Sequence, residues 1–394
     1  MTPGRQPIRE AVATGFTLRD LALYFLRLGT TGFGGPIALV GYMHRDLVEH
    51  RRWFSEADYR EGLALAQLAP GPLAAQLAIY LGWLAAGTRG ATLVAFAFVA
   101  PSFVMVLALS ALYVRYGGLS WMQGAFYGIG AAVIAIIGRS AWKLMRSTLG
   151  RDRVAWTIFA VSALVTAWTE SEIVWLFLAC GFAALAAHAL ASAGSPRLAA
   201  LAPWPLLLSG LHGAASPGLL WRLFLYFAEA GAFVFGSGLA IVPFLHGGVV
   251  NQFHWLTERQ FLDAVAVAMI TPGPVVITVA FIGFLVAGAL GATAAALGVF
   301  LPCYLFVVIP AQYFRRSISS PRVRAFVEGV TAAATGAIAG AAVVLGRRAI
   351  VDVPTVLFAL GTLAAPTWAR KVPEPLVILA AGVLGFLVSS AGLR

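Results

Sequence analysis

The sequence predicts an all-helical integral membrane protein made of two copies of one unit. First, 60% of the 394 residues are hydrophobic and only 11% are charged, a balance that water-soluble domains do not show. Second, apolar stretches of roughly 18 to 26 residues follow one another, and each is long enough to cross the hydrocarbon core as a helix. Third, motifs recur about 202 residues apart, which indicates an internal duplication.

The N-terminus, the two cysteines and the net charge further restrict the kind of protein that the sequence can encode. Residues 1–17 are polar and basic without the apolar core of a signal peptide, so a cytoplasmic N-terminal tail is expected. Cys180 and Cys303 lie in apolar runs without metal-ligand spacing, and we interpret both as packing residues. No cofactor, metal ion or nucleic acid is predicted. The net charge of +11 is explained largely by arginines in cytoplasmic loops, and the remainder favours an anion as cargo.

The duplication is clearest in two pairs of motifs. "FGGP" at 33–36 returns as "FGSG" at 235–238. Pro-Gly-Pro at 70–72 returns as Pro-Gly-Pro at 272–274. Duplication of this kind is typical of secondary transporters.

A longer match extends the duplication, because "GWLAAGTRGAT" at 82–92 resembles "GFLVAGALGAT" at 283–293. The chain is therefore expected to divide into two similar units and two flanking regions. The predicted divisions are a first transporter repeat at 18–149, a connecting transmembrane region at 150–219, a second repeat at 220–349 and a C-terminal transmembrane region at 350–394.

The arginine distribution predicts that the repeats face opposite sides of the membrane. The segment 45–60 carries four arginines, whereas its counterpart in the second repeat carries only Arg259. The next loop shows the reverse, since Arg115 stands nearly alone and the segment 315–324 carries four. Because arginine marks cytoplasmic loops, inverted repeats are expected, with an odd number of crossings between them. The candidate crossings are 154–169, 173–192 and 199–214.

The glycine and Pro-Gly-Pro motifs predict helices that break inside the membrane. Proline removes a backbone donor and clashes with the preceding turn, while glycine adds conformational freedom. Such breaks are tolerated in lipid only where they are buried in protein or line a cavity, and the helix N-termini at a break can hold an anion. The alternative is an ordinary kink, because glycine and proline are common in membrane helices. A potassium filter is excluded because "TTGFG" is not repeated, and a dinucleotide site is excluded because no strand precedes the glycines.

The predicted binding residues belong to these motifs or lie close to them. They are Gly34, Gly35, Pro36, Gln67, Pro70, Gly71, Pro72, Gly236, Ser237, Gly238, Thr271, Pro272, Gly273 and Pro274. Gln76 and Thr278 offer further neutral hydrogen-bonding groups, and any such residue could instead join two helices.

Four charged residues are candidates for coupling or for an ion pair. Glu61 and Asp263 occupy equivalent positions before the two Pro-Gly-Pro motifs, where they could carry protons, anchor the site or act as acids at a helix start. Arg27 and Glu229 form a matched pair of opposite charge before the two glycine motifs. They could form an ion pair between the repeats, or Arg27 could contact the cargo.

Four stretches of the sequence resemble the long-chain chromate transporter family of bacterial membrane proteins. These are "FGGPIALVGYMHRDLVEHRRWFSEADY", "LAPGPLAAQLAIYLGW", "FGSGLAIVPFL" and "ITPGPVVITVAFIGFLVAGALGA". The resemblance implies inverted repeats and chromate export with resistance, with sulfate as a similar anion. It assigns the family's motif positions to Phe33, Gly34, Gly35, Pro36, Pro70, Gly71, Pro72, Gly236, Gly238, Pro272, Gly273 and Pro274. Ala38, Leu39 and Leu73 depart from the polar residues of many members, which leaves the cargo open.

The predicted function is a secondary transporter of the bacterial inner membrane that exports chromate by using the membrane potential or the proton motive force. The alternatives are a transporter of sulfate or another oxyanion, and an anion channel. An enzyme is not predicted, because no apolar segment contains a nucleophile and base at catalytic spacing. The expected partners are a small oxyanion and the lipid bilayer, and a homodimer is left open.

Overall fold

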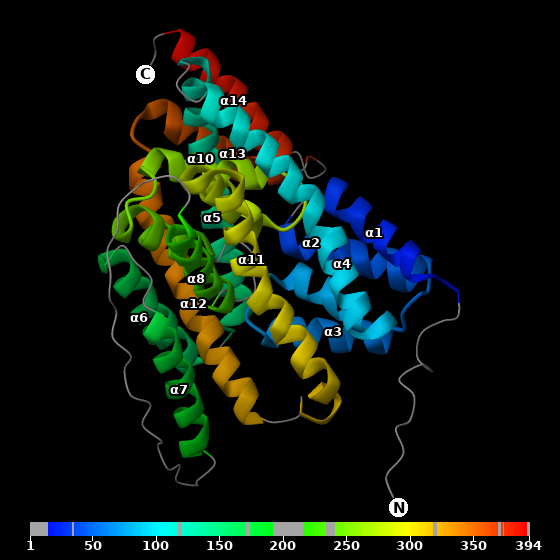
Figure 1. Ribbon diagram of the computed structural model, residues 1–394. Coiled ribbons are helices and arrows are strands. Elements are labelled where there is room, and N and C mark those ends of the chain that lie inside the picture. Colours follow the sequence, from blue (N-terminus) through cyan, green and yellow to red (C-terminus); the bar gives the residue numbers. More distant parts are fainter. Residues whose placement is uncertain are drawn as a thin grey trace, which may run out of the picture.

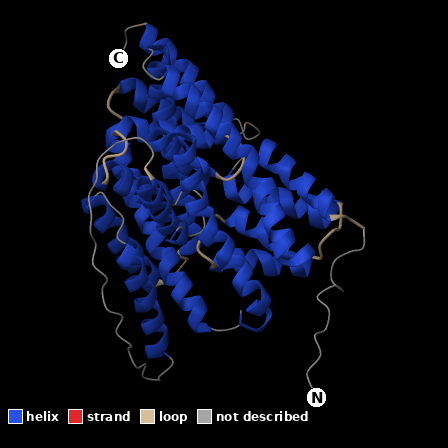
Figure 2. Ribbon diagram, in the orientation of Figure 1, coloured by secondary structure: helices blue, strands red, loops and turns tan. Residues whose placement is uncertain are grey.

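The computed structural model describes residues 15–33, 35–116, 120–150, 152–169, 174–191, 216–233, 241–317, 321–368, 372 and 374–391. Within these ranges every regular element is a helix and no strand occurs (Figure 2). Four of the described segments are long and apolar enough to cross a membrane: Leu73–Tyr116, Met122–Lys143, Val275–Ala311 and Glu328–Ala349. The predicted all-helical membrane class is therefore confirmed.

The two halves of the chain contain elements in the same order (Figure 1). The first half consists of α1 (Leu18–Thr31), α2 (Gly35–Met43), a π-helix (His44–His50), α3 (Glu56–Leu68), α4 (Leu73–Tyr116), α5 (Ser120–Thr148), α6 (Arg153–Thr169) and α7 (Val174–Ala191). The second consists of α8 (Pro217–Phe233), α9 (Ile241–His246), a π-helix (Gly247–Gln252), α10 (Glu258–Ile270), a 3-10 turn (Val275–Ile277), α11 (Thr278–Ser317), α12 (Pro321–Ala349), α13 (Val353–Trp368) and α14 (Glu374–Ser390).

The long helices α4 and α11 each bend at an Ala-Gly step. In α4 the φ/ψ angles are −149°/29° at Ala86 and 62°/−148° at Gly87. In α11 they are −146°/29° at Ala287 and 63°/−154° at Gly288. The positive φ of the second residue is a conformation that glycine adopts without steric cost. Each long helix is therefore two helical segments joined at a bend, and the bends lie in the matched stretches at 82–92 and 283–293.

Small residues let the two segments of each bent helix touch. A Cβ atom on Gly90 would lie 2.0 Å from the carbonyl oxygen of Gly82. A Cβ atom on Gly291 would lie 2.1 Å from the carbonyl oxygen of Gly283. Because backbone meets backbone at both places, no larger residue fits without moving the chain.

The last helices of each half pack on the other half. α12 lies against α6 and α7, as Figure 1 shows, and α5 lies against α13 and α14. Ser162 of α6 donates a hydrogen bond of 2.7 Å to the carbonyl oxygen of Ala333 in α12. Arg139 of α5 forms an ion pair with Glu374 at the start of α14. The two largest hydrophobic clusters also combine residues of both halves, since one includes Val106 and Ile129 of the first half and the other includes Cys303 of the second.

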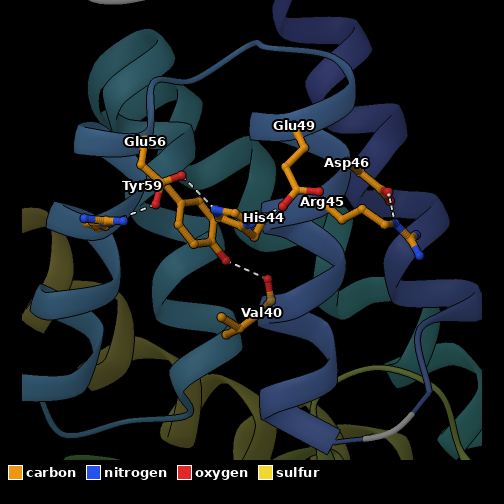
Figure 3. A network of polar contacts seen from close by, with 8 residues as sticks. Val40, His44, Arg45, Asp46, Glu49, Glu56 and Tyr59 are labelled. Atoms are coloured by element: carbon orange, nitrogen blue, oxygen red, sulfur yellow. Dashed lines mark hydrogen bonds and ion pairs between the residues drawn. The ribbon is translucent and has the colours of Figure 1, made fainter.

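A polar network ties the first π-helix to α3 (Figure 3). Nε2 of His44 lies 2.8 Å from a carboxylate oxygen of Glu56, and Nδ1 lies 3.1 Å from Glu49. Nε of Arg60 donates to the other oxygen of Glu56 at 2.7 Å. The second half has a matching contact of 2.9 Å between His246 and Glu258. These contacts fix the turn between π-helix and α-helix in both halves.

We expect Glu56→Gln to destabilise the protein at neutral pH but not in acid. The hydrogen bond with His44, followed by that with Arg60, lowers the pKa of Glu56 below its ordinary value. A carboxyl whose pKa falls on folding adds stability above its ordinary pKa, and this contribution is lost as the pH falls through the lowered value. Thermal unfolding in detergent across this pH range measures the effect. An equal loss at every pH would contradict the electrostatic explanation.

Candidate functional site

The first glycine motif separates two short helices. α1 ends at Thr31, and the N–H of Gly32 donates to the carbonyl oxygen of Leu28 at 2.7 Å. Gly35 opens α2 with a φ of 73°, a conformation that favours glycine. α1 has 14 residues and so spans only about 21 Å, less than the hydrocarbon core of a bilayer. α1 is therefore too short to cross the membrane without a continuation past this interruption.

Each Pro-Gly-Pro motif also interrupts a helix. α3 ends at Leu68 and α4 begins at Leu73, whereas α10 ends at Ile270 and the 3-10 turn precedes α11. The central glycines have φ angles of 138° at Gly71 and 99° at Gly273. Residues 271–283 are all buried. The second break is therefore enclosed by protein rather than exposed to lipid.

The second Pro-Gly-Pro motif contacts the first glycine motif. The N–H of Gly273 donates a hydrogen bond of 2.9 Å to the carbonyl oxygen of Gly32. A Cβ atom on Gly273 would lie 2.0 Å from Oγ of Ser102 in α4. That hydroxyl donates to the carbonyl oxygen of Gly29 at 3.4 Å. Two breaks from different halves of the chain therefore meet at backbone distance beside α4.

The first Pro-Gly-Pro motif lies beside α11, in the same way as the second lies beside α4. A Cβ atom on Gly71 would lie 3.3 Å from Cβ of Cys303 in α11, whose side chain is fully buried. Cys303 corresponds to Ser102 at the repeat offset of about 201 residues. Each Pro-Gly-Pro motif thus lies beside the long helix of the other half. The interpretation of Cys303 as a packing residue agrees with this burial.

Gln76 is a buried polar residue at the first break. Its side-chain amide donates to the carbonyl oxygen of Pro70 at 2.6 Å. Its side-chain oxygen Oε1 is buried and has no hydrogen-bond partner in the described part of the protein. An unpaired buried acceptor costs about 1–3 kcal/mol. Gln76 is therefore a residue that a ligand could satisfy.

The other polar residues of the predicted site occupy different surroundings. Thr271 is buried, and its hydroxyl donates to the carbonyl oxygen of Val267 at 2.6 Å. The hydroxyl of Thr278 donates to Val275 at 2.8 Å. Gln67 has an exposed side chain on α3. Gly34, Gly236, Ser237 and Gly238 lie outside the described residues.

The charged candidates fall into two groups. Arg27 and Glu229 have exposed side chains on α1 and α8, and no ion pair joins these two described residues. Asp263 of α10 is buried, with 5% of its surface exposed. Tyr113 at the end of α4 donates to its carboxylate at 2.7 Å. Glu61, which is the counterpart of Asp263 in the first half, is partly buried on α3.

Gly32, Ser102 and Tyr113 were not predicted from the sequence. The equivalence of Ser102 and Cys303 at the repeat offset was an available signal, since both follow a repeated proline. The contact between Gly32 and Gly273 is a backbone hydrogen bond across the chain, and no residue pattern announces it. The residue equivalent to Tyr113 in the second half is Phe314, which lacks a hydroxyl group, so the duplication does not single out Tyr113.

Comparison with known proteins agrees with the motifs of this site. A family model described as "Chromate transporter" matches the chain twice, at residues 19–185 and 221–386. A chromate transport protein of Cupriavidus metallidurans is 58% identical over 378 residues, which cover 95% of this chain and 94% of that protein. A probable chromate transport protein of Synechococcus elongatus is 56% identical over 384 residues, which cover 95% and 97%.

A more distant relative, a chromate transport protein of Pseudomonas aeruginosa, is 33% identical over 396 residues, covering 96% of this chain and 94% of that protein. No solved structure matches the chain. The family matches include both pairs of motifs and the helices that carry them. The chain belongs to the chromate transporter family and is a membrane protein.

Proposed function

We propose that this protein is a secondary transporter that exports chromate from the cytoplasm and thereby confers resistance to chromate. Family membership supports chromate as cargo. The observation that carries the proposed site is the hydrogen bond of 2.9 Å between Gly273 and Gly32, because it joins breaks from the two halves. Interrupted helices that meet inside a membrane protein are the usual place for a transported ion. Further binding residues are proposed to come from the motif segments around Gly34 and at 236–238.

The electrostatics of the breaks suit an oxyanion. The first N–H groups of α4 have no acceptor within the helix, and a helix N-terminus carries roughly half a positive charge. Ala74 and Ala75 in this first turn are only 2% and 1% exposed, so the turn lies in a medium where these charges are weakly screened. An anion can therefore bind without a buried lysine or arginine.

We further propose that the two halves are inverted repeats, and that each includes its last two helices. The arginine counts at 45–60 and 315–324 support opposite orientations. The family matches run to residues 185 and 386, which supports including α6 and α7 in the first repeat and α13 and α14 in the second. Alternating access would then arise from movement of one repeat against the other around the fixed breaks. The third candidate crossing, 199–214, lies outside the described residues.

Export needs no nucleotide. Moving an oxyanion out of a cell with a negative interior releases about 2.3 kcal/mol per 100 mV for each negative charge that it carries. The potential alone can therefore drive efflux, and a proton that enters the cell in exchange adds to the driving force. Relatives named as transport proteins also favour transport over catalysis.

The test is flux of labelled chromate in proteoliposomes that hold a defined potential. The proposal predicts chromate movement toward the positive side, at a rate that rises with the potential. Movement of sulfate without chromate would reassign the cargo. Currents far above the turnover of a transporter would identify an anion channel instead.

Asp263 is the residue that we propose for proton coupling. It is buried next to Tyr113, whereas Glu61 is partly exposed, and ionisable residues inside membrane proteins mark proton pathways. Asp263→Asn should abolish the stimulation of chromate flux by a proton gradient while retaining the flux driven by the potential.

The matched control is Asp152→Asn, because Asp152 is an exposed residue before α6 whose capping role asparagine retains. Full stimulation by the proton gradient in Asp263→Asn would rule out Asp263 as the proton carrier.

A further inference from the structure

Gln76 lies in the first turn of α4, so its side chain and the first N–H groups of the helix belong to the same turn. α4 begins at Leu73, directly after the first Pro-Gly-Pro motif, and its first N–H groups lack acceptors within the helix. The amide of Gln76 turns back toward the break and donates to Pro70 at 2.6 Å. Oε1 of Gln76 is left buried without a partner in the described structure.

The orientation of the Gln76 amide is determined by its neighbour. The carbonyl oxygen of Pro70 can only accept, so the nitrogen of the amide must face it and the oxygen must face away. A Cβ atom on Gly71 would lie 2.6 Å from Nε2 of Gln76, so glycine is needed for the amide to approach the break. The unpaired atom is therefore an acceptor in a fixed position.

A fully ionised oxyanion does not suit this site, because it has no O–H group and could not donate a hydrogen bond to Oε1 of Gln76. A metal cation does not suit it either, because the helix N-terminus repels positive charge. The matching ligand has several acceptor oxygens for the N–H groups and one O–H group for Oε1 of Gln76. A tetrahedral oxyanion that carries one proton has this arrangement.

We propose that the site binds the monoprotonated form of its oxyanion, hydrogen chromate, and that Gln76 is the residue that selects it. This inference rests on the proposed function and specifies the form of the cargo. Hydrogen chromate loses its proton near neutral pH, whereas hydrogen sulfate and hydrogen selenate are strong acids that remain ionised. The site therefore separates chromate from anions of the same shape by their proton rather than by their size.

Titratable groups of the protein must be separated from the titration of the cargo. Ionisable residues on the elements packed against α4 include Arg27 on α1, Glu61 on α3, Asp263 on α10 and Cys303 on α11, and Asp263 lies against Tyr113 near the C-terminal end of α4. Of these, Cys303 is placed beside the break by its distance to Gly71. If the cargo is the titrating species, Glu61→Gln and Cys303→Ser leave the midpoint of the pH profile unchanged.

The experiment measures initial flux of trace labelled chromate and trace labelled selenate in proteoliposomes, with equal pH on both sides and a fixed potential. Trace concentrations keep chromate monomeric and make the rate proportional to kcat/KM. Chromate flux should fall about tenfold for each pH unit above the last ionisation of hydrogen chromate. Selenate, which is close to chromate in size but stays a dianion, should be carried at least about tenfold more slowly at the acidic end, without a pH trend.

Gln76→Met should remove most of the preference for chromate over selenate. Gln76→Glu should restore it only in acid, where a protonated carboxyl both donates to Pro70 and accepts from the ligand. Gln252→Met, the same change at an exposed glutamine, is the matched control and should behave as the unaltered protein.

Chromate flux that does not fall with pH, or selenate flux equal to that of chromate, would overturn the selection by protonation while leaving chromate transport intact. A pH profile whose midpoint moves in Glu61→Gln or Cys303→Ser would overturn it as well. Flux of neither anion above empty liposomes at any pH would overturn the proposed function together with this inference.

Discussion

Gly273→Leu is expected to abolish chromate transport while the protein still inserts into the membrane. The φ of 99° at Gly273 is a strained conformation for any other residue and costs about 1–3 kcal/mol. A Cβ atom there would also lie 2.0 Å from Oγ of Ser102. Rotation of the Ser102 hydroxyl can relieve the contact but not the backbone strain, so we expect the backbone to move away from Gly32 and to break the hydrogen bond that joins the two halves.

Flux of labelled chromate, together with the amount of monodisperse protein extracted from membranes, measures this prediction. Gly130→Ala is the control, because Gly130 has an ordinary φ and nothing lies within 4 Å of an added Cβ atom. Normal chromate flux in a well-inserted Gly273→Leu protein would contradict the proposed site.

Gly90→Val and Gly291→Val are each expected to prevent folding rather than to affect transport alone. At both positions an added Cβ atom would meet a backbone carbonyl oxygen, at 2.0 Å and 2.1 Å. Backbone cannot rotate away as a side chain can, so the bends of α4 and α11 would have to open. Overpacking typically costs about 1–3 kcal/mol, and we expect a cost at or above the upper end of this range because the contacted atom belongs to the backbone.

Thermal unfolding in detergent and yield of folded protein test this second prediction. Gly138→Val in α5 is the matched control, since no atom lies within 4 Å of an added Cβ at Gly138. If Gly90→Val unfolded at the same temperature as the control, the tight bend would not exist in the folded protein. A similar loss in Gly291→Val would indicate that the two bends are equivalent.

The fold class and the motif positions could be predicted because they depend on local properties. Composition and the length of apolar runs identify membrane helices, and proline and glycine interrupt helices wherever they occur together. The interruptions at Gly35, Gly71 and Gly273 follow from this chemistry, and each has a positive φ. The matched stretches at 82–92 and 283–293 were visible as repeats, but their sharp bends were not predicted.

The contacts between distant segments could not be predicted because they depend on how the halves pack. The bond between Gly32 and Gly273 joins backbone atoms of two segments that are far apart in the sequence. The exchange of terminal helices, in which α12 lies against α6 and α7, leaves no trace in hydropathy. The unpaired oxygen of Gln76 is likewise a property of packing, since a glutamine in an apolar segment usually joins two helices.

Export of chromate driven by the membrane potential is tested by chromate flux in proteoliposomes in which the potential is first set and then collapsed. We expect flux toward the positive side that disappears when the potential is removed and that is absent in Gly273→Leu. Transport of sulfate but not of chromate by the unaltered protein would contradict the proposed cargo.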